Sequence, residues 1–225
     1  MSTTSPSISR VKRSREQARK TYDRYSRWYD YIGGQIERKF AQRGIMLLRV
    51  QPGERVLEIG YGTGHMLVAL AQAVGPQGHV EGIDISLGMY KIAVRRVSNA
   101  QMDSRVTLRV GDALTQPFPS TVFDAIFLSF TLELFDTPEI PVLLHQCQRL
   151  LKPNGRMGVV AIAKRHPATW IQRLYEALHH YFPQWIDCRP IYPSQLLQDH
   201  GFLVLEKQVF PMFGLHVELV TAKKR

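Results

Sequence analysis

The sequence has few cysteines and no long apolar run. Its two cysteines, Cys147 and Cys188, lie far apart and outside any CxxC or Cys/His metal-ligand spacing. Isolated thiols of this kind are typical of a reducing compartment and argue against a disulfide framework. No apolar stretch approaches the roughly 18 residues of a membrane-spanning helix, and the first residues lack the apolar segment of a signal peptide. We therefore expect a cytoplasmic protein. Such a protein could also bind peripherally to the inner face of the membrane.

Acidic side chains are also scarce, and the excess of basic ones is unevenly placed. The chain carries 29 Lys and Arg against 19 Asp and Glu, a net charge of +10. Residues 1–49 hold 12 basic and 4 acidic side chains, whereas residues 50–225 hold 17 and 15. A basic arm suits nucleic acid or an anionic membrane surface. A soluble helix with a solvated charged face explains the same composition equally well.

The remaining composition is that of a globular protein, with 44% hydrophobic and 21% charged residues. We expect a basic N-terminal arm and helical region over residues 1–49 and a larger domain over residues 50–225. Within the arm, Tyr22, Tyr25 and Tyr29 recur at helical spacing and share one face.

The larger domain shows the pattern of an α/β fold. Short β-branched runs alternate with amphipathic stretches of helical length, which favours right-handed βαβ units and a parallel sheet. Two final strands, over 202–210 and 216–222, are joined by only five residues and must form an antiparallel hairpin. The expected strands of the parallel part are residues 55–59, 79–84, 105–110, 123–129 and 157–163.

Residues suited to binding a nucleotide follow each of the first four strands. Glycines that allow close backbone approach follow the first strand, and a carboxylate able to accept both hydroxyls of a ribose follows the second. Ligands of open parallel sheets bind at these carboxyl ends, so we expect a nucleotide site there. A tight strand-to-helix turn is the alternative role of the glycines. The residues concerned are Gly60, Gly62, Gly64, Asp84, Asp112, Ala113 and Ser129.

The glycine spacing does not fit a dinucleotide. The dinucleotide fingerprint needs its third glycine at the sixth position, where this sequence has His65. The segment Glu58-Ile-Gly-Tyr-Gly-Thr-Gly64 instead resembles the first motif of the class I S-adenosylmethionine-dependent methyltransferases. The resemblance continues in order through Gly82–Ser86, Gly111–Ala113, Phe123-Asp124 and Leu150–Gly155. It implies a Rossmann-like seven-stranded sheet, mostly parallel with a C-terminal antiparallel hairpin, helices on both faces, and S-adenosylmethionine as cofactor.

Within that superfamily the chain is similar to the ubiquinone/menaquinone C-methyltransferases and to bacterial phosphatidylethanolamine N-methyltransferases. The segment Tyr22–Asp30 resembles the aromatic helical lid that covers the cofactor in such enzymes. After the fourth strand the chain reads Ser129-Phe-Thr-Leu-Glu-Leu-Phe135, where the quinone enzymes usually have Phe-Gly-Leu-Arg-Asn. This departure removes the specific support for a quinol. The resemblance to the quinone enzymes implies cofactor contacts at Thr63, Asp84, Asp112, Ala113 and Ser129. The further residues that we expect at the cofactor site are Tyr22, Glu58, Gly60, Tyr61, Gly62, Gly64 and Ile85.

The acceptor and the catalytic groups are less defined. No Asp/Asn-Pro-Pro-Tyr follows the fourth strand, no Pro-Cys or Thr-Cys nucleophile motif occurs, and no metal-ligand cluster is present. We expect no metal ion and direct methyl transfer, with Glu133 and Tyr25 as catalytic candidates.

Three functions remain open. The first is methylation of an amphipathic small molecule, quinol-like or a phospholipid headgroup, near a membrane that residues 10–27 would contact. The second is methylation of a soluble metabolite. The third is an inactive Rossmann-like module that binds a nucleoside or tRNA.

Overall fold

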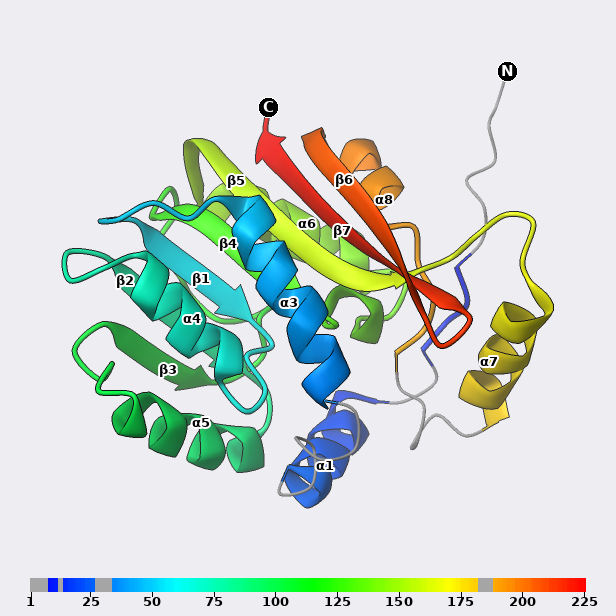
Figure 1. Ribbon diagram of the computed structural model, residues 1–225, viewed down its shortest axis with the longest axis horizontal. Helices are drawn as coiled ribbons and strands as arrows, with labels where there is room; N and C mark the ends of the chain where they lie inside the picture. The colour runs from blue at the N-terminus through cyan, green and yellow to red at the C-terminus, as the bar shows by residue number, and fades with distance from the viewer. Residues whose placement is uncertain (1–7, 12–13, 27–33, 182–187) are drawn as a thin grey trace.

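A single mixed sheet organises the chain (Figure 1). The computed structural model describes residues 8–11, 14–26, 34–181 and 188–225. The strand order is β3-β2-β1-β4-β5-β7-β6, with β1 to β5 parallel and β7 antiparallel to both of its neighbours. The fold class predicted from the sequence, including the terminal hairpin, is therefore confirmed. The strands are Arg55–Ile59 (β1), His79–Asp84 (β2), Val106–Val110 (β3), Phe123–Ser129 (β4), Leu151–Ala163 (β5), Phe202–Met212 (β6) and Leu215–Lys224 (β7).

Helices cover both faces of the sheet. In Figure 1, α3, α4 and α5 lie in front of the sheet, and α6 and α8 lie behind it. None of the described helices has the length and apolar content needed to cross a bilayer. The helices are Arg15–Tyr25 (α1), Gly34–Leu48 (α3), His65–Ala73 (α4), Leu87–Asn99 (α5), Glu139–Leu150 (α6), Trp170–Tyr181 (α7) and Pro193–Asp199 (α8), with a 3-10 turn at Leu132–Leu134 (η1).

Strand β5 is longer than the sequence predicts. It begins at Leu151 rather than Met157, because the expected turn between α6 and β5 is an irregularity inside the strand. Leu151 pairs with Phe123 and Arg156 pairs with Ala125, so the segment between them bulges out of register. Asn154 has a positive φ of 62° within this bulge.

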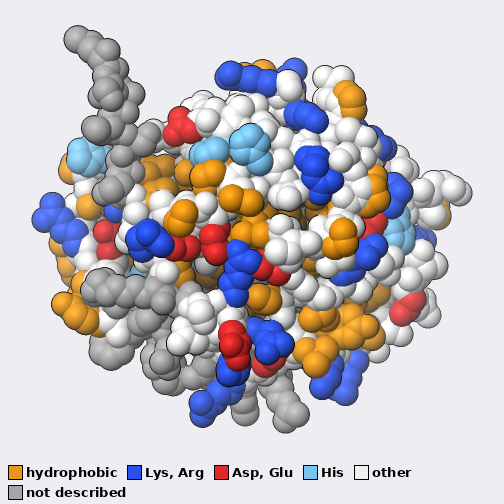
Figure 2. Space-filling view, turned by 180° about the vertical axis from the view of Figure 1, so that it is seen from behind, with side chains coloured by type: hydrophobic (Ala, Val, Ile, Leu, Met, Phe, Trp, Pro, Cys, Tyr) orange, Lys and Arg blue, Asp and Glu red, His pale blue; other side chains and the backbone are white. Residues whose placement is uncertain are grey.

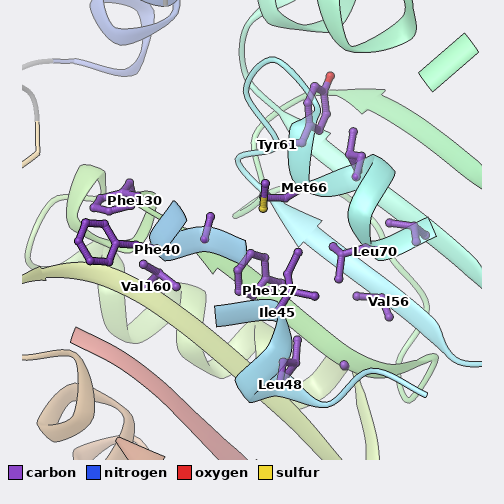
Figure 3. Close-up of a cluster of buried hydrophobic side chains, with 14 of the residues drawn as sticks. Phe40, Ile45, Leu48, Val56, Tyr61, Met66, Leu70, Phe127, Phe130 and Val160 are labelled. Atoms are coloured by element: carbon purple, nitrogen blue, oxygen red, sulfur yellow. The ribbon is translucent and has the colours of Figure 1, made fainter. Parts of the chain in front are cut away.

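Helix α3 packs closely on the centre of the sheet (Figure 3). Its buried side chains Phe40 and Leu48 belong to the same hydrophobic cluster as Phe127 and Val160. A Cβ atom at Gly44 would lie 2.4 Å from Cγ2 of Val160, so only glycine allows this approach. The domain boundary at residue 49 stays a prediction, and α3 on its N-terminal side contributes to the core.

Candidate functional site

A cleft opens at the carboxyl ends of β1, β2 and β4, where the sequence places the site. The cleft is open to solvent, and its empty space, including this open part, is about 870 Å³. Helix α1 crosses this edge of the sheet and forms one wall. Residues that line the cleft include Arg15, Tyr22, Gly60, Gly62, Asp84, Ile85, Asp112, Ala113, Ser129, Phe130, Leu134 and Phe135.

The glycine loop between β1 and α4 needs its glycines for both conformation and space. Gly60, Gly62 and Gly64 all have positive φ angles, of 75°, 52° and 84°. A Cβ at Gly60 would lie 2.4 Å from Oγ1 of Thr131, and one at Gly64 would lie 2.9 Å from the Cβ of Ala93. A Cβ at Gly62 would have no neighbouring atom within 4 Å, so the loop backbone there is free to meet a ligand.

Asp84 at the end of β2 holds two loops together at the base of the cleft. Its Oδ2 accepts a hydrogen bond of 2.9 Å from the amide of Gly62, and its Oδ1 accepts one of 2.9 Å from the amide of Ser86. Burial raises the pKa of Asp84 to about 6, although these two amide hydrogen bonds oppose the rise. The carboxylate is thus fixed in orientation and faces the cleft.

A second cavity lies beside the glycine loop, and residues that line it have buried polar atoms without a hydrogen-bond partner in the described part of the chain. It has an empty space of about 480 Å³, with Glu58 and Arg38 in its wall. Glu58 is 2% exposed, and its Oε2 has no hydrogen-bond partner. Burial, with Asp84 nearby, raises the pKa of Glu58 well above its usual range. The Nε of Arg38 is buried and also lacks a partner. Sequence reasoning missed Arg38, because one arginine on an amphipathic helix forms no motif.

Three further predicted contacts occupy different surroundings. Thr63 lines the second cavity, and Ile85 lines the cleft. Tyr61 also borders the second cavity, but its ring belongs to the hydrophobic cluster under α4 and its hydroxyl donates to the carbonyl of Arg109 at 3.2 Å. Its side chain therefore helps to brace the loop.

Asp112 and Ala113, after β3, complete the cleft opposite the glycine loop. The Oδ1 of Asp112 accepts a 2.9 Å hydrogen bond from the amide of Leu114, which fixes its side chain. The guanidinium of Arg15 on α1 forms ion pairs with both Asp112 and Glu139. Arg15 therefore joins the β3 side of the cleft to the start of α6.

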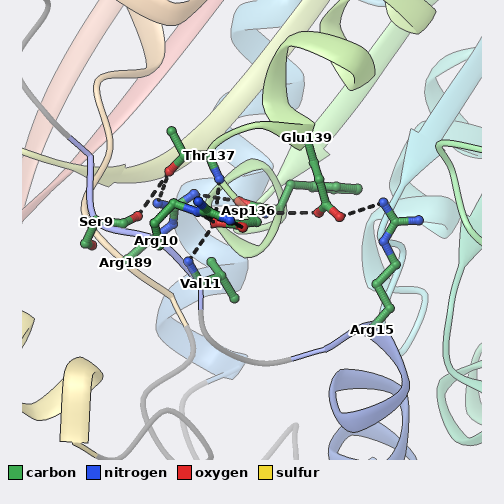
Figure 4. A network of polar contacts seen from close by, with 9 residues as sticks. Ser9, Arg10, Val11, Arg15, Asp136, Thr137, Glu139 and Arg189 are labelled. Carbon is green, nitrogen blue, oxygen red and sulfur yellow. Dashed lines mark hydrogen bonds and ion pairs between the residues drawn. The ribbon is translucent and has the colours of Figure 1, made fainter.

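The described residues 8–11 and 14–26, here called the N-terminal strap, are attached on the β4 side of the cleft (Figure 4). Arg10 donates hydrogen bonds to both carboxylate oxygens of Asp136, with Nε 2.9 Å from each oxygen and Nη2 2.6 Å from Oδ2. The amide of Val11 donates to the same carboxylate at 2.8 Å, and Thr137 Oγ1 donates to the carbonyl of Ser9 at 3.2 Å. Arg10 holds the pKa of Asp136 at about 2, well below its usual value.

The strap is also attached on the β2 side. Asp23 near the end of α1 accepts a 2.6 Å hydrogen bond from the hydroxyl of Ser86 and a 2.8 Å hydrogen bond from the amide of Gly88. These donors lie at the start of α5, where an anionic side chain is stabilised by free amide groups. The strap is therefore bonded to both sides of the cleft that it crosses.

Of the two catalytic candidates, the structure describes the side chain of Glu133 but not that of Tyr25. Glu133 is fully buried, and its Oε1 accepts a 3.1 Å hydrogen bond from the amide of Ile162 at the end of β5. Tyr25 ends α1, but its side chain lies outside the described part of the structure, as do Trp28 and Tyr29.

Arg189 was not anticipated from the sequence, because an isolated arginine in a loop carries no pattern. Its fully buried guanidinium donates to the carbonyls of Glu133 and Phe135 and to Oγ1 of Thr137, at 3.2, 2.6 and 2.9 Å. Burial lowers its pKa to about 10. Arg189 thereby fixes the loop that follows β4.

Basic side chains are spread over the rear face rather than collected in one patch (Figure 2). Acidic side chains lie among them near the middle of this face. Among the described residues, no three His, Cys, Asp or Glu side chains are grouped so that they could hold a metal ion.

Known proteins match the chain in sequence. A family model described as a methyltransferase domain matches residues 56–155. Demethylmenaquinone methyltransferase of Listeria monocytogenes is 30% identical over 161 residues, which cover 70% of this chain and 67% of the relative. Nocamycin O-methyltransferase of Saccharothrix syringae is 34% identical over 138 residues, covering 61% of this chain and 48% of that protein.

Solved structures share the fold at lower identity. The [4+2]-cyclase SpnF has a TM-score of 0.72 at 18% identity, over 96% of this chain and 99% of its own. A S-adenosylmethionine-dependent methyltransferase from Aquifex aeolicus has a TM-score of 0.65 at 20% identity, over 89% and 97%. The glycine loop, the carboxylate after β2, the sheet order and the sequence relatives agree on one assignment. The chain belongs to the class I S-adenosylmethionine-dependent methyltransferases.

Proposed function

We propose that the cleft binds the adenosine part of S-adenosylmethionine between the glycine loop and the strap. Asp84 would accept hydrogen bonds from the two ribose hydroxyls, because its carboxylate is fixed at the base of the cleft by the amides of Gly62 and Ser86. Asp112 and Ala113 would meet the adenine, and Tyr22 would cover it from α1. Gly60, Ile85 and Ser129 would supply the remaining contacts at the strand ends.

The second cavity suits the amino-acid end of the same cofactor. A buried carboxylate oxygen and a buried guanidinium nitrogen without partners are costly unless a ligand pairs with them. An α-amino acid is a zwitterion, so its ammonium group could pair with Glu58 and its carboxylate with Arg38. Gly62 lines both cavities and Thr63 lines the second. The loop from Gly62 to Gly64 would contact the part of the cofactor that joins the ribose to the amino acid.

The contribution of the protein to catalysis is positioning. When bound, S-adenosylmethionine supplies an electrophilic methyl group on a sulfonium. The chain would hold an acceptor atom in line with that methyl group and exclude water from the closed cleft, and such alignment contributes about 7–11 kcal/mol in favourable cases. Glu133 holds the end of β5 and Arg189 holds the loop after β4. Both residues would therefore help to fix the shape of the part of the cleft that holds the acceptor.

For the acceptor we propose an amphipathic molecule with an apolar ring, quinol-like rather than a phospholipid headgroup. The observation that carries this proposal is the apolar wall on the β4 side of the cleft, formed by Phe130, Leu134 and Phe135. The name of the 30%-identical relative supports the same class. The scattered basic side chains of the rear face give no continuous track for tRNA (Figure 2).

The test is methyl transfer from radiolabelled S-adenosylmethionine to a panel of acceptors. The panel contains a short-chain demethylated naphthoquinol kept reduced, phosphatidylethanolamine vesicles and an extract of water-soluble metabolites. We expect the label to enter the organic phase with the quinol. Label found only with phosphatidylethanolamine would select the headgroup, and label found only in the aqueous extract would select a soluble metabolite; either result would refute the quinol. Asp84→Ala controls for label that is not transferred by this site.

A further inference from the structure

Helix α7 exposes an apolar face to solvent, and its inner face combines the partly buried Ile171 and Tyr175 with buried polar side chains. Gln172 and His179 are 3% and 6% exposed, whereas Trp170, Leu174 and Tyr181 are 73%, 52% and 74% exposed. Leu178 belongs to the same exposed face. A helix on the surface of a soluble domain normally has the opposite orientation. The exposed apolar face therefore calls for a partner.

The inward orientation of the polar face is fixed by specific bonds. The Oε1 of Gln172 accepts from the amide of Arg165 at 3.0 Å, and its Nε2 donates to Glu176 at 3.0 Å. Glu176 also pairs with Lys164 at 3.3 Å. Tyr175 donates its hydroxyl to the carbonyl of Cys188 at 2.8 Å. Rotating the helix to bury its apolar side would break all of these bonds.

The charge around the exposed face has one sign. Residues 164–181 contain three Lys or Arg and one acidic residue, and that acidic residue, Glu176, is paired with Lys164. Arg165 and Arg173 are exposed and have no carboxylate partner in the described part of the chain. Apolar and aromatic side chains flanked by exposed guanidinium groups are the combination that binds an anionic lipid surface.

The dimensions of the face favour a membrane over a second copy of the chain. A helix of 12 residues is about 18 Å long. One face of such a helix offers far less than the roughly 800 Å² per partner of a stable protein interface. A helix lying in a lipid headgroup region needs no complementary surface.

We propose that α7 docks this protein on an anionic membrane surface, with Trp170, Leu174, Leu178 and Tyr181 inserted among the headgroups and Arg165 and Arg173 facing the lipid phosphates. The helix follows β5 in the chain (Figure 1). Strand β5 is parallel to β4, so its carboxyl end lies on the same side of the sheet as the cleft. Exposed Phe213, at the tip of the β6–β7 hairpin beside Ile171, lies next to the helix. The role of this docking in delivering an acceptor rests on the proposed function, whereas the docking itself does not.

Vesicle binding tests the proposal without cofactor or acceptor, so it can fail while methyl transfer succeeds, or succeed while methyl transfer fails. The full chain is sedimented with vesicles of equal phosphatidylcholine and phosphatidylglycerol at low salt. We expect binding, and Leu174→Asp should lower the partition coefficient about tenfold or more, because a leucine inserted among the lipids is replaced by an anion. Met46→Asp, which places the same charge on exposed apolar surface of α3, should bind as the unmodified protein does.

A direct readout comes from Trp170. In a chain carrying Trp28→Phe and Trp185→Phe, its emission should shift to shorter wavelength with these vesicles and not with pure phosphatidylcholine. Equal binding by Leu174→Asp and the unmodified chain, or no shift of the Trp170 emission, would overturn the proposal. A dimer that Leu174→Asp dissociates, without vesicle binding, would assign the face to a second copy and would overturn it as well.

Discussion

At the scale of single residues, the groups that shape the site fall into two kinds: Asp84 and the glycines belong to a motif, whereas Arg38, Glu133 and Arg189 are isolated in the sequence. Asp84 and the three glycines were predicted because their spacing after two strands has a geometric meaning. Arg38 and Arg189 were missed because their importance arises from burial, which depends on segments far away in the sequence. Glu133 was noticed, yet only the fold shows that its carboxylate bonds the amide of Ile162.

Replacement of Asp84 should weaken cofactor binding and leave the sheet folded, although the amides of Gly62 and Ser86 lose their acceptor. Two charge-assisted hydrogen bonds of about 1.5–3 kcal/mol each connect the proposed ribose to this carboxylate. We expect Asp84→Ala to lower the affinity for S-adenosylhomocysteine by at least about tenfold in calorimetry. Asp103→Ala, at an exposed aspartate, serves as the control. An unchanged affinity in Asp84→Ala would place the ribose elsewhere.

The raised pKa of Asp84 predicts a pH dependence of cofactor binding. Because the ionised carboxylate is the better acceptor for two hydroxyls, binding favours loss of its proton. Affinity for S-adenosylhomocysteine should therefore be constant above the pKa of about 6 and fall as the pH drops below it. Titration calorimetry between about pH 5 and pH 8 measures this, and Asp84→Asn should flatten the profile. A flat profile in the unmodified protein would mean that Asp84 does not titrate in this range.

At the scale of the elements, the alternation of sequence patterns predicted the order of strands and helices, but it did not predict that β5 begins at Leu151. The Lys-Pro-Asn-Gly segment has the residues of a turn, but in the structure it forms a bulge within the strand. Pairing with β4 stabilises this bulge, and such pairing is a tertiary effect that the local sequence does not show. The inverted orientation of α7 was likewise invisible, because an amphipathic pattern does not say which side faces the protein.

The contact between α3 and the sheet predicts a stability effect at Gly44. Alanine suits a helix better than glycine by roughly 1 kcal/mol, but its methyl group would clash with Val160 and Phe127. We expect Gly44→Ala to lower the free energy of unfolding by about 1–3 kcal/mol in urea denaturation. Gln42→Ala, on the exposed side of the same helix, should stay within about 0.5 kcal/mol of the unmodified protein. A more stable Gly44→Ala would show that α3 can move away from the sheet.

At the scale of the whole molecule, the strap connects parts of the cleft that belong to opposite halves of the sheet. The sequence predicted a helix with cleft-facing aromatic residues, but not its attachment points, since Asp136 and Ser86 lie more than 60 residues away from their partners. Arg10→Ala should speed the dissociation of S-adenosylhomocysteine several-fold in stopped-flow measurements, because it weakens the attachment of the strap on the β4 side. Arg19→Ala, at an exposed position of α1, is the control. Equal dissociation rates in the two variants would show that the ligand leaves while the strap stays bonded to the β4 side of the cleft.

A strap bonded on both sides also bears on the timing of the catalytic cycle. With the cofactor bound as proposed, the product S-adenosylhomocysteine would lie beneath the strap, and each turnover would include detachment of the strap. Such steps take microseconds to milliseconds and often limit the overall rate. Under that regime the steady-state rate would be nearly the same for acceptors of very different nucleophilicity, and isotopic substitution in the transferred methyl group would leave it unchanged. The chemistry would then be visible only in the first turnover, before any strap has had to reopen.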